Sequence, residues 1–178
     1  PPPPPAPPLR FCFHDEDGIR DSSTSRGLGD GDKRQRRLDQ RKFDEWNDLF
    51  AEGGMYWIPL EEYQEDPLNH LSLAYEDSMM RQVRINRLNH DRAWSQKPRS
   101  RTSHTVSAIV VESVCEASNQ LVVGSAFSMA EWRSFGNRTF AGLYTHTLQI
   151  SDGRLQIVEK RVDLIDSSEA FEPIEVFI

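Results

Sequence analysis

Residues 96–111, QKPRSRTSHTVSAIVV, decide the fold of this chain. Pro98 restricts the backbone at the start of the stretch, and two arginines at alternate positions follow, Arg99 and Arg101. His104 lies one step out of phase with them, and the β-rich segment beyond it is too apolar to face water on both sides. We interpret the stretch as a cationic segment that leads into a buried strand. It is suited to an anion or to an acidic partner.

The second half of the chain continues with β character. Four long segments are expected to be strands: His104–Glu116, Gln120–Phe135, Arg138–Ser151 and Leu155–Asp166. Turn residues separate them: Asn119, Gly136-Asn137 and Asp152-Gly153. Connections this short predict an antiparallel meander.

The first half predicts helices and two short strands. A helix is expected from about Asp32 up to Gly53-Gly54, with an apolar stripe at helical spacing made of Phe43, Trp46, Leu49 and Phe50. Short strands are expected at Met55–Leu60 and Leu71–Tyr75. Helices followed by a curved antiparallel sheet predict an α+β domain with the helices packed on one face.

A second helix is predicted over Ser78–Leu88. Three apolar residues are expected to face inward, Met80, Val83 and Leu88. Three arginines recur on another face, Arg81, Arg84 and Arg87, either as a salt-bridged surface or as part of an interface.

Length and composition suit one domain over residues 38–178, preceded by a flexible Pro-, Gly- and Ser-rich leader over residues 1–37. The net charge of −7 argues against nucleic acid as a partner. Only Cys12 and Cys115 are present, which is not a disulfide framework and indicates a reducing compartment. We find neither an apolar run near the ~20 residues of a membrane span nor a signal peptide, so we expect a soluble cytoplasmic protein without membrane contact.

Residues 38–178 resemble the small (beta) subunit of aromatic-ring-hydroxylating dioxygenases. The resemblance rests on six segments in the family's order: residues 38–50, 56–59, 66–77, 98–111, 144–148 and 160–165. It implies the cone-shaped fold of nuclear transport factor 2, scytalone dehydratase and ketosteroid isomerase, also called cystatin-like, with N-terminal helices on a curved, mainly antiparallel sheet.

The resemblance also implies a function. Small subunits of this family are non-catalytic and hold large subunits in an α3β3 complex that cis-dihydroxylates an aromatic compound. The large subunit carries a Rieske [2Fe–2S] cluster and a mononuclear Fe(II), and a ferredoxin or reductase supplies electrons from NAD(P)H. We therefore expect no catalytic residue, no cofactor and no metal in this chain, whose Cys and His residues show no ligand spacing.

Six residues are candidates for the subunit interface: Trp57, Arg84, Arg87, Arg99, Arg101 and His104. Arginine suits a subunit boundary because its planar fork makes bidentate contacts with carboxylates. The alternatives for the cationic stretch are a solvated strand edge and an anion site. Trp94 and Trp132 are further possible anchors, although burial in the core explains each tryptophan equally well.

A stand-alone enzyme of the same fold, a dehydratase or isomerase, is the alternative function. Tyr144 and His146 lie on one face of a predicted strand and would project into the cone near Tyr75 or Asp77. The competing interpretation is that both are hydrogen-bonded members of a packed sheet.

Overall fold

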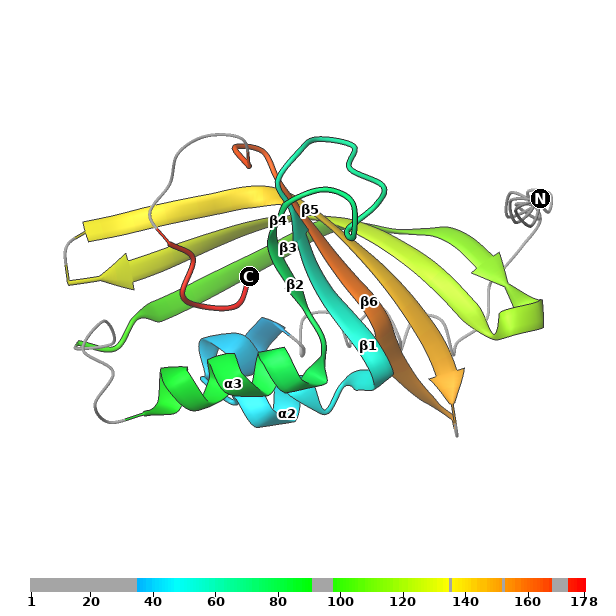
Figure 1. Ribbon diagram of the computed structural model, residues 1–178, viewed down its shortest axis with the longest axis horizontal. Coiled ribbons are helices and arrows are strands. Elements are labelled where there is room, and N and C mark those ends of the chain that lie inside the picture. The colour runs from blue at the N-terminus through cyan, green and yellow to red at the C-terminus, as the bar shows by residue number, and fades with distance from the viewer. Residues whose placement is uncertain (1–34, 91–97, 135, 152, 168–172) are drawn as a thin grey trace.

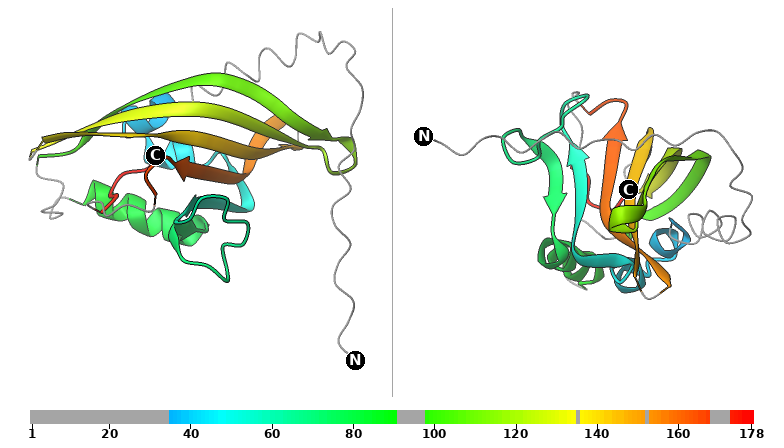
Figure 2. Two further views of the ribbon diagram at one scale, coloured as in Figure 1. Left: turned by 90° about the horizontal axis from the view of Figure 1, so that it is seen from above. Right: turned by 90° about the vertical axis from the view of Figure 1, so that its right-hand side faces the viewer.

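The computed structural model describes residues 35–90, 98–134, 136–151, 153–167 and 173–178. Six strands form one curved sheet in the order β2-β1-β6-β5-β4-β3 (Figure 1). The helices and the last residues of the sequence lie on the concave side of this sheet (Figure 2). The predicted α+β architecture, with helices on one face of a mainly antiparallel sheet, is confirmed.

Four consecutive strands form the predicted meander: β3 (Arg101–Cys115), β4 (Gln120–Arg133), β5 (Gly136–Ser151) and β6 (Arg154–Leu164). Each strand pairs antiparallel with the next one along the chain. The residues that signalled turns provide the unusual backbone there, since Asn119 has φ 51° and Gly153 has φ 70°. The meander is confirmed, and its strands begin and end within a few residues of the predicted bounds. The prediction that β3 is a buried strand is wrong, because β3 is an edge strand of the sheet and none of its residues is buried as a whole.

Two shorter strands widen the sheet beyond β6. They are β1 (Phe50–Pro59) and β2 (Ser72–Glu76), and both were predicted. β1 runs parallel to β6, whereas β2 runs antiparallel to β1. The parallel pair of β1 with β6 brings together strands from the two ends of the domain sequence.

The first helix is shorter than predicted. Residues 35–39 are helical, but Arg41 adopts a left-handed backbone with φ 57°, and α2 (Phe43–Asn47) is a separate short helix. Phe43 and Trp46 are buried, as the apolar stripe predicted. The expected start of the helix at Asp32 lies outside the described residues.

The glycine pair does not end a helix, and this prediction is wrong. Phe50 already pairs with Ile157 of β6, and Gly53 and Gly54 lie inside β1 at an irregularity in that pairing. A Cβ atom on Gly54 would lie 2.6 Å from the Ile157 carbonyl oxygen. Glycine is needed here because two backbones approach closely.

The second helix, α3 (Ser78–Asn89), forms as predicted, but it presents a different face to the core. Met80 and Val83 are exposed, whereas Arg81, Ile85 and Leu88 are buried. The expected inward positions of Met80 and Val83 are therefore wrong. The reason is Arg81, whose side chain takes the inward position.

Arg81 is held by polar groups from three elements. Its Nε donates to Asn47 Oδ1 at 2.8 Å, and its Nη1 donates to the carbonyl oxygens of Gly54 at 2.7 Å and Glu76 at 3.0 Å. The guanidinium also stacks on Phe50 at 3.8 Å from the ring centre. Burial lowers the pKa of Arg81 to about 10. The arginine joins α2, β1 and α3 beneath the sheet.

Aromatic side chains fill the space between the sheet and the helices. Trp46 packs edge-on to Phe50 at 5.0 Å and to Tyr56 at 5.8 Å between ring centres. Phe177 comes from the last described segment and lies 4.6 Å from Trp46. This core lies between the concave side of the sheet and the helices (Figure 2).

Candidate functional site

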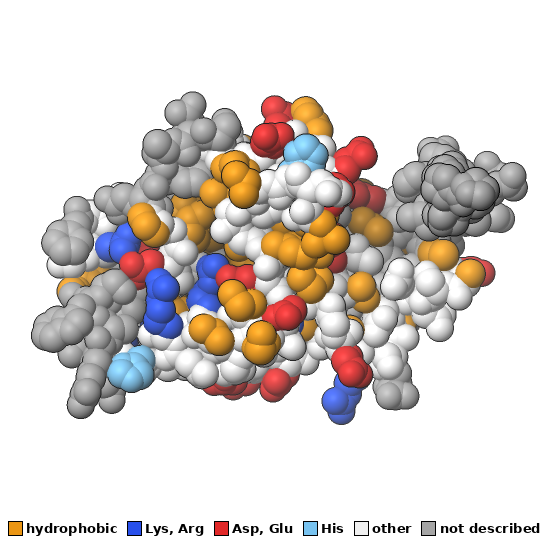
Figure 3. Space-filling view, in the orientation of Figure 1, with side chains coloured by type: hydrophobic (Ala, Val, Ile, Leu, Met, Phe, Trp, Pro, Cys, Tyr) orange, Lys and Arg blue, Asp and Glu red, His pale blue; other side chains and the backbone are white. Residues whose placement is uncertain are grey.

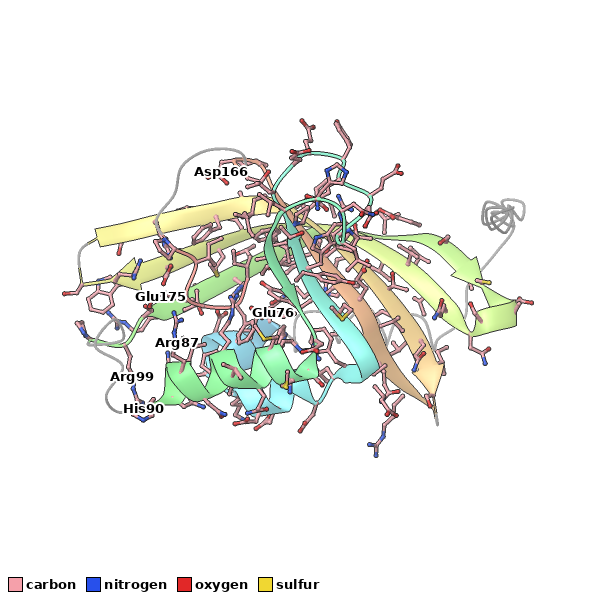
Figure 4. The ribbon with its side chains drawn as sticks, viewed as in Figure 1. Glu76, Arg87, His90, Arg99, Asp166 and Glu175 are labelled. Carbon is pink, nitrogen blue, oxygen red and sulfur yellow. The ribbon has the colours of Figure 1, made fainter. Side chains whose placement is uncertain are left out.

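The six candidate interface residues fall into two groups. Arg87, Arg99 and Arg101 are exposed, whereas Trp57, Arg84 and His104 have side chains that are mostly or fully buried. The exposed group lies at one end of the molecule, where Figure 4 shows Arg87 and Arg99 near Glu175. The exposed group presents its side chains to solvent, as a partner contact requires. Trp94 lies outside the described residues.

Arg101 is ordered by an aromatic neighbour. It lies directly opposite Trp132 in the pairing of β3 with β4, and its guanidinium carbon is 4.5 Å from the centre of that ring. Both side chains are exposed. A cation above an exposed aromatic ring gains about 0.5–1 kcal/mol, which is enough to bias its orientation. Arg101 and Trp132 therefore form a preorganised cationic and aromatic surface.

Arg99 adds positive charge at the same end. Burial and the charge of Arg99 lower the pKa of Arg41. Arg41 donates to the Leu88 carbonyl oxygen at 2.8 Å and so anchors the end of α3. We name the surface of Arg99, Arg101 and Trp132 the cationic patch.

A buried carboxylate ties the strands below the cationic patch to the last segment of the chain. Glu131 is fully buried on β4 and accepts a hydrogen bond from Arg138 Nε at 2.6 Å. Arg138 also donates to the Pro173 carbonyl oxygen at 3.1 Å, and Arg133 pairs with Glu175 at 3.4 Å. Glu131 and Arg138 are cross-strand partners in the hairpin. The hairpin register could have revealed this pair from the sequence.

His104 faces the interior and binds a carboxylate from the N-terminal helical turn. Its Nδ1 lies 2.6 Å from Asp39 Oδ1, and its backbone N donates to Asp39 Oδ2 at 3.1 Å. Thr102 Oγ1 donates to the same carboxylate at 2.9 Å. Asp39 thus fastens the helical turn to β3. Sequence reasoning missed it because the two partners are 65 residues apart.

Protonation of this pair follows from its surroundings. Burial lowers the pKa of His104 and outweighs the raising effect of Asp39. Burial would raise the pKa of Asp39, but the hydrogen bonds from His104 and Thr102 hold it below the ordinary value. A neutral imidazole therefore donates through Nδ1 to an ionised carboxylate, while the buried Nε2 has no hydrogen-bond partner among the described residues.

Arg84 and Trp57 serve the inside of the domain. Arg84 pairs with the buried Glu76 and lies 5.2 Å from the centre of the Phe177 ring. The Trp57 indole donates to Ser72 Oγ at 2.9 Å and is covered by Arg161. Both residues make contacts within the single chain, although Arg84 Nη1 and Glu76 Oε2 have no hydrogen-bond partner among the described residues. Any contribution to a partner interface would be indirect.

Tyr144 and His146 do lie together, with ring centres 5.6 Å apart. Tyr144 is buried, stacks on Phe127 at 4.0 Å and has Lys160 Nζ 4.3 Å from its ring centre. Burial raises the pKa of Tyr144 well above its ordinary value, so the phenol stays protonated. Such a group can donate a proton or a hydrogen bond but cannot act as a base near neutral pH.

The interior next to Tyr144 is filled by the chain itself. Phe177 and Ile178 are buried, and Lys160 Nζ donates to the Ile178 oxygen at 2.6 Å. The Ile178 N–H donates to Tyr56 Oη at 3.1 Å. These two residues are therefore part of the packed core. The arrangement favours a packed, structural interior.

Metal-ligating side chains do not gather in the part of the chain that the structure describes, where no group of three or more His, Cys, Asp or Glu could hold an ion. His104 is bound to Asp39, and Cys115 is exposed at the end of β3. These residues therefore do not fit a Rieske cluster or a mononuclear iron. Among the described helices, none is long and apolar enough to cross a membrane.

Comparison with known proteins gives one consistent result. The family model for ring hydroxylating beta subunits matches residues 34–168. The small oxygenase component of the p-cumate 2,3-dioxygenase system of Pseudomonas putida is 31% identical over 138 residues, which cover 76% of this chain and 74% of that protein. The beta subunit of benzene 1,2-dioxygenase of Pseudomonas putida is 31% identical over 144 residues, covering 74% of this chain and 75% of that one.

A solved structure shows the same fold. The crystal structure of the beta subunit of benzoate 1,2-dioxygenase from Burkholderia mallei has a TM-score of 0.65 at 21% identity, covering 83% of this chain and 93% of that chain. At this sequence identity, the structural similarity supports a shared fold and nothing further. It confirms the cone-shaped fold with a curved open sheet.

Proposed function

The chain belongs to the family of ring hydroxylating beta subunits, and from this premise we propose that it is the non-catalytic small subunit of an aromatic-ring-hydroxylating dioxygenase. Three copies would hold three large subunits in register in an α3β3 complex. The large subunits would take electrons from NAD(P)H through a ferredoxin or reductase and add both atoms of O2 to an aromatic ring. The product would be a cis-dihydrodiol.

The filled cone is the observation that supports a structural role. Phe177 and Ile178 are buried in the interior of the cone, and hydrogen bonds from Lys160 and to Tyr56 hold Ile178 there. The alternative dehydratase or isomerase would need that space open. Among the described residues, Tyr144 stacks on Phe127 and has no hydrogen-bond partner that would act as its base.

The iron centres would belong entirely to the large subunit. A Rieske site needs paired cysteine thiolates with two histidines, and the described residues of this chain supply no such group. The relatives named above act on different aromatic compounds, p-cumate and benzene. This variety is consistent with a small subunit that does not select the substrate.

The cationic patch is our candidate for the subunit boundary. Arg99 and Arg101 are exposed, and Arg101 is already oriented by Trp132, so binding would cost little additional side-chain ordering. Arg87 lies at the same end. Carboxylates of a neighbouring subunit would pair with these guanidinium groups in bidentate geometry. His104, Arg84 and Trp57 would support this boundary from within.

Charge reversal tests the assignment. The variant with Arg99→Glu and Arg101→Glu, co-expressed with a tagged large subunit, should lose most of its co-purification because like charges would then meet across the boundary. Arg154→Glu is the control, since Arg154 is equally exposed but lies at the start of β6. Normal recovery of the double variant would overturn the interface assignment.

A further inference from the structure

The loop between β1 and β2, residues 60–71, has the composition of a binding surface. It contains four carboxylates and neither lysine nor arginine; the acids are Glu61, Glu62, Glu65 and Asp66. Three large apolar side chains are displayed beside them with most of their surface exposed, namely Tyr63 at 82%, Leu68 at 80% and Leu71 at 80%. Figure 3 shows acidic and hydrophobic side chains side by side where this loop projects from the molecule. Apolar surface displayed in this way marks an interaction site.

Buried hydrogen bonds hold the loop in one conformation. Gln64 is buried, its Oε1 accepts from the Leu60 backbone N at 3.1 Å, and its Nε2 donates to Ser72 Oγ at 3.2 Å. Arg161 Nη1 donates to the Gln64 carbonyl oxygen at 2.6 Å, which fastens the loop to β6. Asp66 Oδ1 accepts from the Leu68 backbone N at 2.8 Å. The exposed apolar side chains are therefore presented by a preorganised scaffold.

Tyr63 adopts a left-handed backbone within a turn, which the Gln64 N–H closes by donating to the Glu61 carbonyl oxygen at 3.3 Å. Its φ is 60°, a left-handed conformation that costs a bulky residue roughly 1 kcal/mol or more. The ring that this conformation presents is almost wholly in water. The turn thus displays the aromatic side chain in water, where another molecule can cover it.

The complementary surface is present on the same chain. The cationic patch has two exposed arginines, whose charge is opposite to that of the loop. It also has an exposed aromatic residue, Trp132. Figure 1 shows the β1–β2 loop and the start of β3, which carries Arg101, at well-separated parts of the molecule. The two surfaces can therefore be used by different neighbours.

We propose that the β1–β2 loop of one copy docks on the cationic patch of the next copy, head to tail. The carboxylates of residues 61–66 pair with Arg99 and Arg101, while Tyr63, Leu68 and Leu71 cover Trp132. Such a contact joins two different surfaces, and it forms a closed ring when the rotation between successive copies closes. The inference rests on the proposed function, since it names which neighbour meets the cationic patch in the small-subunit trimer.

The test measures the mass of the purified full-length small subunit in solution by sedimentation or light scattering. The loop variant combines Glu61→Lys, Glu62→Lys and Glu65→Lys; the patch variant combines Arg99→Glu and Arg101→Glu. Each should weaken self-association about tenfold or more and shift the protein towards monomer, because like charges would meet. Arg154→Glu should leave the mass unchanged.

Combining both sets of changes in one chain gives the decisive result. The combined variant carries a positive loop and a negative patch, so it should recover the oligomeric mass that each set alone destroys. The proposal would be overturned if the loop variant or the patch variant stayed oligomeric. It would also be overturned if the combined variant stayed monomeric, or if the wild-type chain were itself monomeric. If the patch variant lost large-subunit binding but kept the small-subunit oligomer, the docking proposal would be overturned and the proposed function would still stand.

Tyr63→Gly provides a second variant that cannot fail by misfolding of the loop. Glycine adopts positive φ without strain, so the melting temperature of the monomer should stay the same or rise. Self-association should nevertheless weaken, because the aromatic contact is gone. Unchanged self-association in Tyr63→Gly would contradict the role assigned to the ring.

Discussion

Replacing Phe177 with alanine tests whether the last segment of the chain fills the cone. Phe177 is 1% exposed, and its ring centre lies 4.6 Å from that of Trp46, 5.7 Å from Tyr56 and 6.0 Å from Phe43. Truncation of a phenylalanine buried this completely costs about 3–5 kcal/mol, from lost transfer free energy and from the cavity left behind. For a chain of this length, that loss lowers the melting temperature by about 6–20 °C.

The assay is equilibrium unfolding in denaturant followed by tryptophan fluorescence, with Trp46 as the nearest reporter. Ile165→Ala is the matched control, because Ile165 is 81% exposed and its truncation should change the free energy of unfolding by less than about 0.5 kcal/mol. A loss below about 1 kcal/mol for Phe177→Ala would refute the reasoning. Phe177 would then lie outside the core, and the cone would be open to a ligand.

Three further outcomes follow from single contacts. The pKa of buried His104 is below its unfolded value of 6.5, so the unfolded chain binds a proton first as the pH falls. The folded state should therefore lose stability as the pH falls from about 7.5 through the folded pKa. His104→Asn should flatten this decline in thermal melts. Gly54→Ala should destabilise the domain by more than about 1 kcal/mol in denaturant titrations, because its Cβ would lie 2.6 Å from the Ile157 oxygen; an unchanged midpoint would contradict the close approach. Asp77→Ala should cost about 1 kcal/mol by the same assay, because Asp77 Oδ1 caps α3 through the Met80 N–H at 2.8 Å, whereas Asp77→Asn should retain most of the stability.

The sheet could be predicted well because its signals are local. Turn residues such as Asn119 and Gly153 separate long segments of β character, and short turns leave only antiparallel pairing. The first helix was predicted less well because Phe50 continues a helical spacing from Phe43 and Trp46. Pairing with Ile157 of β6, more than 100 residues away, draws Phe50 into a strand.

The candidate site was partly visible in the periodicity of the sequence. Arg101 and His104 differ in phase, and on β3 this places the arginine on the solvent face and the histidine inside. The carboxylate that binds His104 could not be found, because Asp39 comes from a helical turn that only the tertiary fold brings near. The same limit hid Lys160, which looks like a surface residue in the sequence but is fully buried against Ile178.

The inward position of Arg81 shows why side-chain type alone misled the prediction for α3. Helical spacing allows either Arg81 or Met80 to face the sheet, and hydrophobicity favours methionine. The structure selects arginine because Asn47, Gly54 and Glu76 supply acceptors for its guanidinium. Buried charge is stable only where such partners exist, and they lie on other elements.

The most direct test of the central claim is to purify a tagged copy of this chain from cells growing on an aromatic carbon source, and to measure the mass and iron content of what accompanies it. The proposed function predicts a brown complex with equal numbers of small and large subunits, whose iron is lost when the large partner is stripped away. A colourless assembly of this chain alone, with no larger partner, would contradict it.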